Sequence, residues 1–179
     1  MSSVYLDTNV FVASYKGDDL YHKEAVTIIK ALERKQIKGQ TSVLTILEMA
    51  AVASRNVKIY TGDDEREVRS IAISKAILSL SKLGLTFIHN PGDAATVMDG
   101  ITIDMPMILN QALLLAYSVG LRSFDLVHLA AAKHSKQTGR ELSAFVTGDS
   151  DFLAKKSVIS QILETPVLSP PEYVSGIGL

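Results

Sequence analysis

The sequence predicts an α/β fold in which helices alternate with the strands of a parallel sheet. Two short apolar segments rich in strand formers, 3–6 and 142–147, are each followed within two residues by a carboxylate, Asp7 or Asp149. Strands that alternate with helices along a chain become parallel neighbours joined by right-handed crossovers. Because open α/β sheets bind ligands beyond the carboxyl ends of their strands, these two acids are expected to share a pocket.

The totals favour a soluble globular protein whose 179 residues form a single domain, 1–179. Hydrophobic residues make up 47% and charged residues 21%, and the net charge of −1 does not by itself indicate a nucleic-acid binder. The absence of cysteine excludes disulfides and thiolate metal sites, and it favours a reducing, cytoplasmic setting. No apolar run reaches the roughly 18 residues of a membrane span, so neither a membrane partner nor a signal peptide is expected.

Apolar periodicity, capping residues and turn formers divide the chain into elements. Helices are predicted at 10–14, 20–34, 41–54, 65–83, 106–119, 124–136 and 151–163. Further strands are predicted at 85–89 and 167–168. Residues 39–40 form a short connection or a weak strand, 96–104 form a small hairpin or an extended loop, and the tail from Pro170 frays. Thr41 or Ser42 is expected to cap the helix that runs to about residue 54.

Glu48 lies within the apolar face of the helix predicted at 41–54. At about 100° per residue, it shares one arc with Leu44, Leu47, Ala51 and Val52. A carboxylate in such a face costs free energy unless it is paired or bound to a cation. Arg55, seven positions further along the chain, is an alternative partner for Glu48.

Five acids stand out by their context. Asp7, Asp149 and Asp151 follow strands, and Glu48 interrupts an apolar face. Asp125 opens a helix in which residues 126–132 are almost wholly apolar or small, except His128. Like charges repel, so a cluster is tenable at neutral pH only if a cation neutralises it or some of its acids stay protonated. Oxygen ligands without cysteine suit Mg²⁺ or Mn²⁺. Mg²⁺ bound to carboxylates keeps positions open for water and phosphate oxygens, as metal-assisted hydrolysis of phosphodiesters requires.

Four ordered motifs resemble the PIN domain, and more narrowly the VapC-type toxin ribonucleases of bacteria and archaea. The motifs are LDTNV at 6–10, LE at 47–48, FDLVHLAAA at 124–132 and TGDSDF at 147–152. Each is weak alone, but together and in order they span most of the chain. The resemblance implies a compact PIN-like α/β/α sandwich with a central parallel sheet of about five strands. It also implies RNA cleavage that depends on Mg²⁺ or Mn²⁺, a homodimer and often a small antitoxin.

Matched to the family motifs, the four catalytic and metal-ligating acids are Asp7, Glu48, Asp125 and Asp149. Asp151 matches a further position that is often acidic and reaches the metal through water. The resemblance also assigns Thr8 or Asn9 to the support of Asp7, and Thr147 to hydrogen bonding within the pocket.

Most of these residues also have a purely structural interpretation. Asp7, Asp149 or Asp151 can cap the helix that follows it, and Asp125 complements a helix dipole. His128, about one turn after Asp125, is expected to be a satisfied core histidine rather than a ligand. Arg122 lies just before the Asp125 helix, where it contacts substrate phosphate or is simply a solvated surface charge.

The alternatives differ in class. The chain is longer than a typical toxin of this type, with the stretches 56–64 and 91–105 as the apparent insertions, and longer PIN proteins process RNA in other roles. A phospho-acceptor receiver would need a lysine at the end of a late strand, whereas Lys155 lies on a predicted helix. A non-catalytic PIN-like module that binds RNA or protein would have no use for a costly acid cluster.

Overall fold

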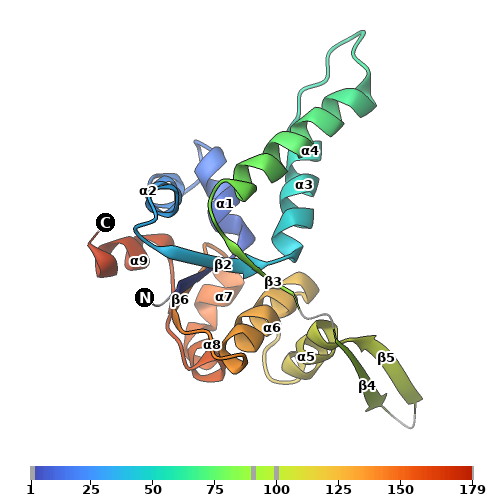
Figure 1. Cartoon of the computed structure of the whole chain (residues 1–179), viewed down its shortest axis with the longest axis vertical. Helices are drawn as coiled ribbons and strands as arrows, with labels where there is room; N and C mark the ends of the chain where they lie inside the picture. Colours follow the sequence, from blue (N-terminus) through green and yellow to red (C-terminus); the bar gives the residue numbers. More distant parts are fainter. Residues whose placement is uncertain (1–2, 90–91, 99–100, 179) are drawn as a thin grey trace.

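The computed structural model describes residues 3–89, 92–98 and 101–178, which form a parallel sheet between two layers of helices (Figure 1). The sheet has five strands in the order β3-β2-β1-β6-β7. They are β1 (Ser3–Leu6), β2 (Lys38–Ser42), β3 (Thr86–Ile88), β6 (Leu142–Val146) and β7 (Val167–Leu168). Every neighbouring pair in this sheet is parallel, so the predicted α/β/α sandwich with about five parallel strands is confirmed.

Strand β1 lies at the centre of the sheet, and the chain builds outward from it in both directions. On one side β1 pairs with β2, and on the other side it pairs with β6, where Leu6 lies opposite Val146. The strand order therefore reverses between β1 and β6. In open α/β sheets, such a switch point at the carboxyl ends of the strands is where ligands bind.

Each face of the sheet is covered by its own set of helices. One layer takes buried side chains from α1 (Thr8–Tyr15), α2 (His22–Glu33), α3 (Leu44–Asn56), α4 (Glu65–Ser81) and α9 (Pro170–Ile177). The other layer takes them from α5 (Met107–Ala116), α6 (Ser123–Gln137), α7 (Ser150–Ala154) and α8 (Lys156–Leu163). Both faces of the sheet are thus buried, which explains why β1 and the second half of β6 are apolar on both sides.

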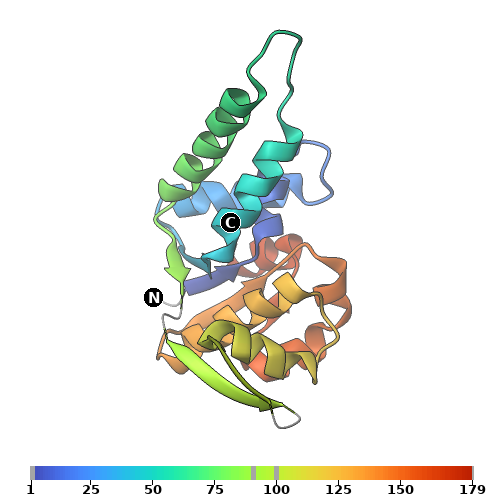
Figure 2. The same cartoon turned by 90° about the vertical axis from the view of Figure 1, so that its right-hand side faces the viewer.

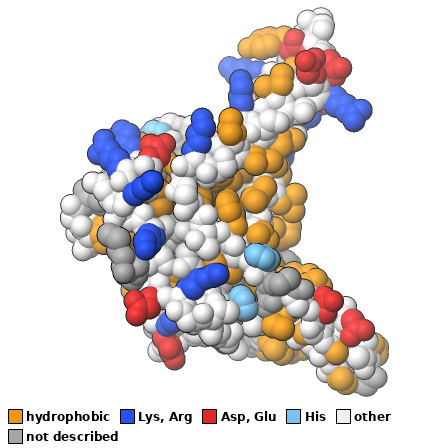
Figure 3. All heavy atoms as spheres, in the orientation of Figure 1, with side chains coloured by type: hydrophobic (Ala, Val, Ile, Leu, Met, Phe, Trp, Pro, Cys, Tyr) orange, Lys and Arg blue, Asp and Glu red, His pale blue; other side chains and the backbone are white. Residues whose placement is uncertain are grey.

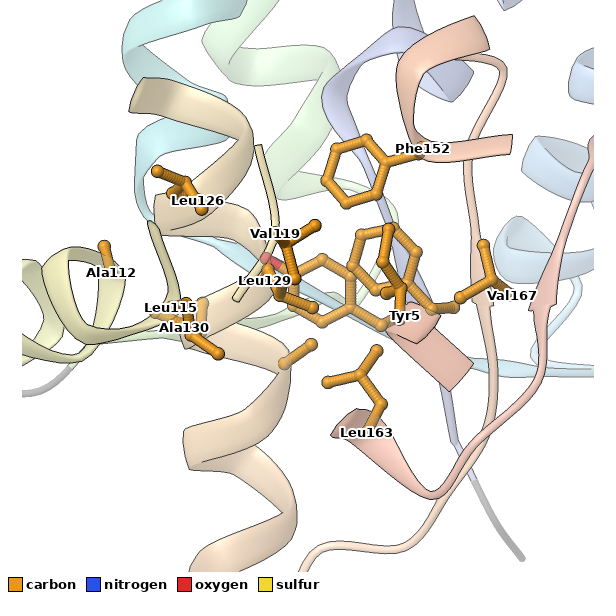
Figure 4. Packing of buried hydrophobic residues seen from close by; sticks show 14 of the residues in the cluster. Tyr5, Ala112, Leu115, Val119, Leu126, Leu129, Ala130, Phe152, Leu163 and Val167 are labelled. Carbon is orange, nitrogen blue, oxygen red and sulfur yellow. The ribbon is translucent and has the colours of Figure 1, made fainter. Parts of the chain in front are cut away.

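Successive side chains of β1 enter opposite layers, as the alternation along a strand requires. Val4 and Leu6 join the α1–α2 side, whereas Tyr5 joins the α5–α8 side. The Tyr5 ring stacks on Phe145 with 4.9 Å between ring centroids, and Phe145 in turn stacks on Phe152 at 5.1 Å. Figure 4 shows Tyr5 among the labelled side chains of this layer.

Two segments project from the sandwich (Figure 2). One is the helix pair α3 and α4 with its connection at 57–64. The other is an antiparallel hairpin of β4 (Asp93–Met98) and β5 (Ile101–Pro106), which resolves the prediction for 96–104 in favour of the hairpin. These projections coincide with the predicted insertions at 56–64 and 91–105, although residues 91 and 99–100 lie outside the described part of the chain.

Apolar side chains are exposed along both projections, as the space-filling view shows (Figure 3). On the helix pair they include Val43, Leu47, Ile71 and Leu78, and on the hairpin they include Ile101. Exposed apolar surface of this extent is typical of protein contacts. Among the helices of the described residues, none combines the length and the hydropathy needed to cross a lipid bilayer.

Strand β2 is longer than the weak strand predicted at 39–40, because its polar residues are satisfied inside the protein. The Thr41 hydroxyl donates to the carbonyl of Leu6 at 2.7 Å, and Gln40 hydrogen-bonds Ser3 and Ser135. Thr41 and Ser42 therefore belong to the strand, and Val43 occupies the N-cap position of α3. The prediction that Thr41 or Ser42 is the cap residue is wrong, although the Ser42 hydroxyl accepts a hydrogen bond from the Leu44 amide at 3.1 Å.

The C-terminal region departs from the prediction in two ways. The helix predicted at 151–163 is divided at Lys155 into α7 and α8. The tail predicted to fray forms helix α9 through residue 177. Its N-cap, Ser169, makes a capping box with Glu172, and Tyr173 is buried against the sheet layer. Reciprocal capping and one buried aromatic side chain thus hold a segment that its proline pair suggested was irregular.

We expect Ser169→Ala to lower the free energy of unfolding by about 1 kcal/mol, because it removes the side-chain cap of α9. Urea unfolding followed by circular dichroism measures the change. Ser175→Ala, an exposed serine in the same helix, is the control and should be close to neutral. Equal stability of the two variants would mean that the Ser169 cap does not stabilise the protein in solution.

Candidate functional site

Asp7 is held at the junction between β1 and α1. As the N-cap of α1 its Oδ1 accepts a hydrogen bond from the Thr8 amide at 2.7 Å. Its Oδ2 accepts hydrogen bonds from the Asn9 side-chain amide at 2.6 Å and from the Thr147 hydroxyl at 2.8 Å. Asp7 is therefore a helix cap, as its structural interpretation predicts, and its buried carboxylate is fixed by three donors.

The second strand end is tied to the first by the same side chains. The Gly148 amide donates to Asn9 Oδ1 at 2.7 Å, and the Asp149 amide donates to the Thr147 hydroxyl at 3.0 Å. Asp149 caps α7 by accepting from the Asp151 amide at 2.7 Å. Asn9 and Thr147 thus set the spacing between the acids that follow β1 and β6.

Four of the predicted acids line one pocket of about 310 Å³ at this edge of the sheet, namely Asp7, Glu48, Asp125 and Asp149. Elements far apart in the sequence supply them: the ends of β1 and β6, the middle of α3 and the first turn of α6. Thr8, Asn9, Arg55 and Phe124 also line the pocket. The structure therefore brings together the acids that the sequence singled out.

Within the described residues, Asp125, Asp149 and Asp151 form a close group, in which one carboxylate oxygen from each residue lies within 4.8 Å of the other two. Asp125 Oδ2 is buried and has no hydrogen-bond partner in the part of the chain that the structure describes. A buried acceptor without a partner costs free energy, whereas a cation would satisfy it. Three carboxylates with one such oxygen are a donor set that fits a divalent metal ion.

The five acids predicted as metal ligands therefore divide into two sets. Asp125, Asp149 and Asp151 form the close triad, whereas Asp7 and Glu48 line the same pocket but lie outside the triad among the described residues. Asp151, predicted to reach the metal through water, belongs to this triad. Sequence spacing could not show this, because the division depends on how α7 turns after its cap.

Burial and the repulsion between neighbouring acids raise the pKa of two carboxyl groups in the pocket. Burial, followed by the charges of Asp149 and Asp7, raises the pKa of Asp125 to about 6. Burial also raises the pKa of Asp7, although the nearby His128 and the hydrogen bond from Thr147 oppose the rise. A divalent ion would relieve both effects, because it favours the charged form of each acid.

His128 lies behind the pocket with only 1% of its side chain exposed. Its Nε2–H donates to Glu48 Oε2 at 2.8 Å and lies 3.6 Å from Asp7 Oδ1, while its Nδ1 lies 3.0 Å from the Tyr5 hydroxyl. His128 is the satisfied core histidine that the sequence predicts. Its partners, however, include two of the candidate acids, a connection that the sequence did not indicate.

His128 and Glu48 shift each other's protonation. Burial alone would lower the pKa of His128, but the charges of Asp7 and Glu48 outweigh it, so the pKa is raised. Burial alone would raise the pKa of Glu48, but hydrogen bonds from His128 and Thr8 outweigh it, so the pKa is lowered. Glu48 is thus held as an ionised carboxylate in a fixed position.

The residues predicted to bind substrate have different positions. Thr8, Asn9 and Thr147 hydrogen-bond the acids and hold them in place. Arg122 is exposed at the N-cap of α6, with its Nε 3.6 Å from Asp151 Oδ2. Arg55, considered in the sequence only as a partner for Glu48, lines the pocket and adds a second cation there.

Comparison with known proteins adds no family assignment. No protein-family model matches the chain, and no curated protein matches it. The resemblance to the PIN domain therefore rests on the four motifs, and the confirmed sheet topology is consistent with it.

In metal-free protein, Asp125→Asn is expected to raise the free energy of unfolding by about 1 kcal/mol near neutral pH, after discounting for partial exposure. The pKa of Asp125 is raised to about 6 in the folded state, so the folded state binds this proton more tightly than the unfolded state does. Wild-type stability therefore falls as pH rises through about 6, whereas the variant escapes this loss.

Urea unfolding in EDTA, at about pH 7.5 and about pH 5, measures the difference, which should shrink at the lower pH. Asp104→Asn, an exposed acid on β5, is the matched control and should change little. If Asp125→Asn is no more stable than wild type near pH 7.5, the proposed repulsion is absent.

Proposed function

We propose that the protein is a PIN-type endoribonuclease that depends on Mg²⁺ or Mn²⁺, related in function to the VapC toxins. The observation that carries the proposal is the meeting of acids from four elements in one pocket at the switch point of a parallel sheet. A buried, unpaired oxygen of Asp125 within a triad of carboxylates supports a cation at this position. The motif order supports RNA as the substrate.

In such a reaction, different residues would bind the metal ion and activate the water molecule. Asp125, Asp149 and Asp151 would hold the metal ion, with Asp7 and Glu48 beside it in the pocket. When bound, the ion supplies Lewis-acid chemistry, since it lowers the pKa of water and neutralises phosphate charge. Glu48, ionised and fixed by His128 and Thr8, is placed to orient a water molecule and accept its proton.

Arg55, which lines the acidic pocket, and Arg122, which lies beside Asp151 of the triad, would supply the cationic contribution. Guanidinium groups bind phosphate oxygens in a paired geometry, and contacts to the backbone of RNA give affinity without sequence choice. These two side chains would hold the strand on either side of the phosphate that is cleaved. The acids would then meet that phosphate only through the metal ion.

The biological setting has two candidates. As a toxin, the protein would form a homodimer and bind a small antitoxin, and the exposed apolar side chains on both projections suit protein partners. The projections themselves favour the second candidate, a PIN nuclease that processes RNA and is not a toxin. A small protein with DNA-binding character encoded directly upstream would decide for the toxin.

The other function classes have less support. In a phospho-acceptor receiver a lysine would reach the acids, but the Lys155 ammonium group donates to the carbonyl of Gly120. A non-catalytic RNA- or protein-binding module would gain nothing from a repulsive acid triad, and it predicts neither metal binding nor cleavage. The cleavage assay below therefore separates it from the nuclease.

Wild-type protein is expected to cleave mixed single-stranded RNA with Mg²⁺ or Mn²⁺ and to lose this activity in EDTA. Asp149→Asn should lower the rate by more than about 100-fold, since even changes behind metal ligands cost 10–100-fold. The substitution is mild for folding, because asparagine also caps helices. Gel analysis of labelled RNA is the measurement, with Asp104→Asn as an active control. Wild-type rates in Asp149→Asn would refute the mechanism.

Tyr5→Phe removes only the hydroxyl that contacts His128 Nδ1, and we expect it to lower metal affinity or kcat by roughly 10-fold or more. The reason is that His128 would no longer be held in the orientation that fixes Glu48. Mn²⁺ titration by calorimetry and single-turnover cleavage measure the two effects. Tyr173→Phe, a buried tyrosine of the other layer, is the matched control. Identical Mn²⁺ binding and kcat in both variants would show that the Tyr5 hydroxyl is only structural.

A further inference from the structure

A groove beside the acidic pocket has no role in the chemistry proposed above. It has a volume of about 450 Å³ and lies between α1, α3 and α4. Most of its wall is apolar, formed by Val12, Met49, Val52, Ala53 and Ala76. Its volume is within the range of about 300–1,000 Å³ typical of cavities that hold small ligands.

The groove and the acidic pocket are neighbours, because Val12 of α1 and Val52 of α3 line both. On α1 the pocket is lined by Thr8, Asn9 and Val12, and the groove by Val12, Tyr15 and Lys16. Moving along this helix thus leads directly from one cavity to the other. A strand whose phosphate lies at the acids would therefore reach the groove with a neighbouring nucleotide.

The two cavities are opposite in charge. Four carboxylates and one cation, Arg55, line the pocket, whereas the charged side chains among the described residues that line the groove are Lys16 and Lys75, both exposed. Lysines attract the phosphates of a polyanion, while the acids repel them unless a metal ion intervenes. The charges that line the groove therefore favour a phosphate, whereas most of those that line the pocket oppose one.

The groove also offers an aromatic face and an amide. Tyr15, the last residue of α1, lines it with 61% of the residue exposed, and Asn56, the last residue of α3, lies along the same groove. Proteins that bind single strands stack bases on aromatic side chains and hold the backbone with cations. The Asn56 amide adds a donor and an acceptor for the edge of a base.

We propose that this groove is a nucleotide subsite for single-stranded RNA, next to the phosphate that is cleaved. The base lies against Tyr15 and the apolar wall of α3, and its phosphate lies near Lys16 and Lys75. The inference rests on the proposed function for the path of the strand, and it adds a place where the substrate is gripped. A helix of a partner protein could fill the apolar wall, but it would not require two lysines beside a phosphodiester site.

The test measures binding separately from cleavage. All variants are made in the Asp149→Asn background, so that RNA is not consumed, and fluorescence anisotropy follows a fluorescein-labelled single-stranded oligoribonucleotide of mixed sequence. Tyr15→Ala should weaken binding on the order of five- to a hundred-fold, the range for loss of one stacked base. Tyr15→Trp should restore it.

Salt dependence tests the two lysines. Lys16→Ala and Lys75→Ala should each lower the slope of log Kd against log salt by about 0.7, as expected for one lost phosphate contact on a single strand. The matched controls are Tyr60→Ala, an exposed tyrosine outside the groove, and Lys38→Ala, an exposed lysine at the amino end of β2. Both should bind RNA like the background protein.

The outcomes separate this proposal from the nuclease proposal. Weaker binding in the groove variants supports the subsite even if wild-type protein cleaves no RNA. Unchanged binding in those variants, or no binding in the background protein, overturns the subsite, while wild-type cleavage would leave the nuclease standing. If light scattering shows a dimer that Tyr15→Ala dissociates with no change in RNA affinity, the groove is an interface between copies and the proposal fails.

Discussion

The structure of the site depends on the pairing of β1 with β6 and on the polar side chains that join their carboxyl ends. Asn9 hydrogen-bonds Asp7, Thr147 and the Gly148 amide, and Thr147 hydrogen-bonds Asp7 and the Asp149 amide. Each of these bonds crosses from one strand end to the other or fixes an acid next to the crossing. The position of two acids 142 residues apart in the chain is thereby set by a handful of hydrogen bonds in a buried corner.

That arrangement holds like charges together, and the rest of the site compensates for the repulsion in part. His128 carries a raised pKa and faces both Asp7 and Glu48, so it offsets charge on one side of the pocket. Asp125 has no such partner for its Oδ2 and carries the raised pKa instead. Within the triad, Arg122 lies 3.6 Å from Asp151 Oδ2, so Asp125 is the acid whose charge is least compensated. Such local instability is typical of sites built to bind a ligand rather than to stabilise the fold.

Apolar runs and the acids after them were enough to predict the central strands and the shared pocket, because burial on both faces of a parallel sheet leaves a plain signal. The full length of β2 could not be predicted in this way, because Gln40 and Thr41 are polar. Their burial is favourable only because they hydrogen-bond partners such as Ser135 and Leu6. Helix α9 could have been predicted from the spacing of Ser169 and Glu172, because these two residues form its capping box. The hydrogen bonds that connect Tyr5 to His128 and His128 to Glu48 could not be predicted from the sequence. They join three elements that meet only in the folded protein.

The continuity of α1 gives the acidic pocket and the groove a common frame. The helix begins at the Asp7 cap, presents Thr8 and Asn9 to the acids, and ends with Tyr15 at the groove. A rigid helix fixes the separation of side chains far better than a loop, and sites on such elements are the more precise for it. Val12 lines both cavities, and Tyr15 and the Asp7 cap lie at opposite ends of the same helix, so a change in the tilt of α1 would move both ends together. The Asp7 cap accepts a hydrogen bond from Thr147, which follows β6. The pairing of β1 with β6 therefore positions both the acids and the helix that lines the groove.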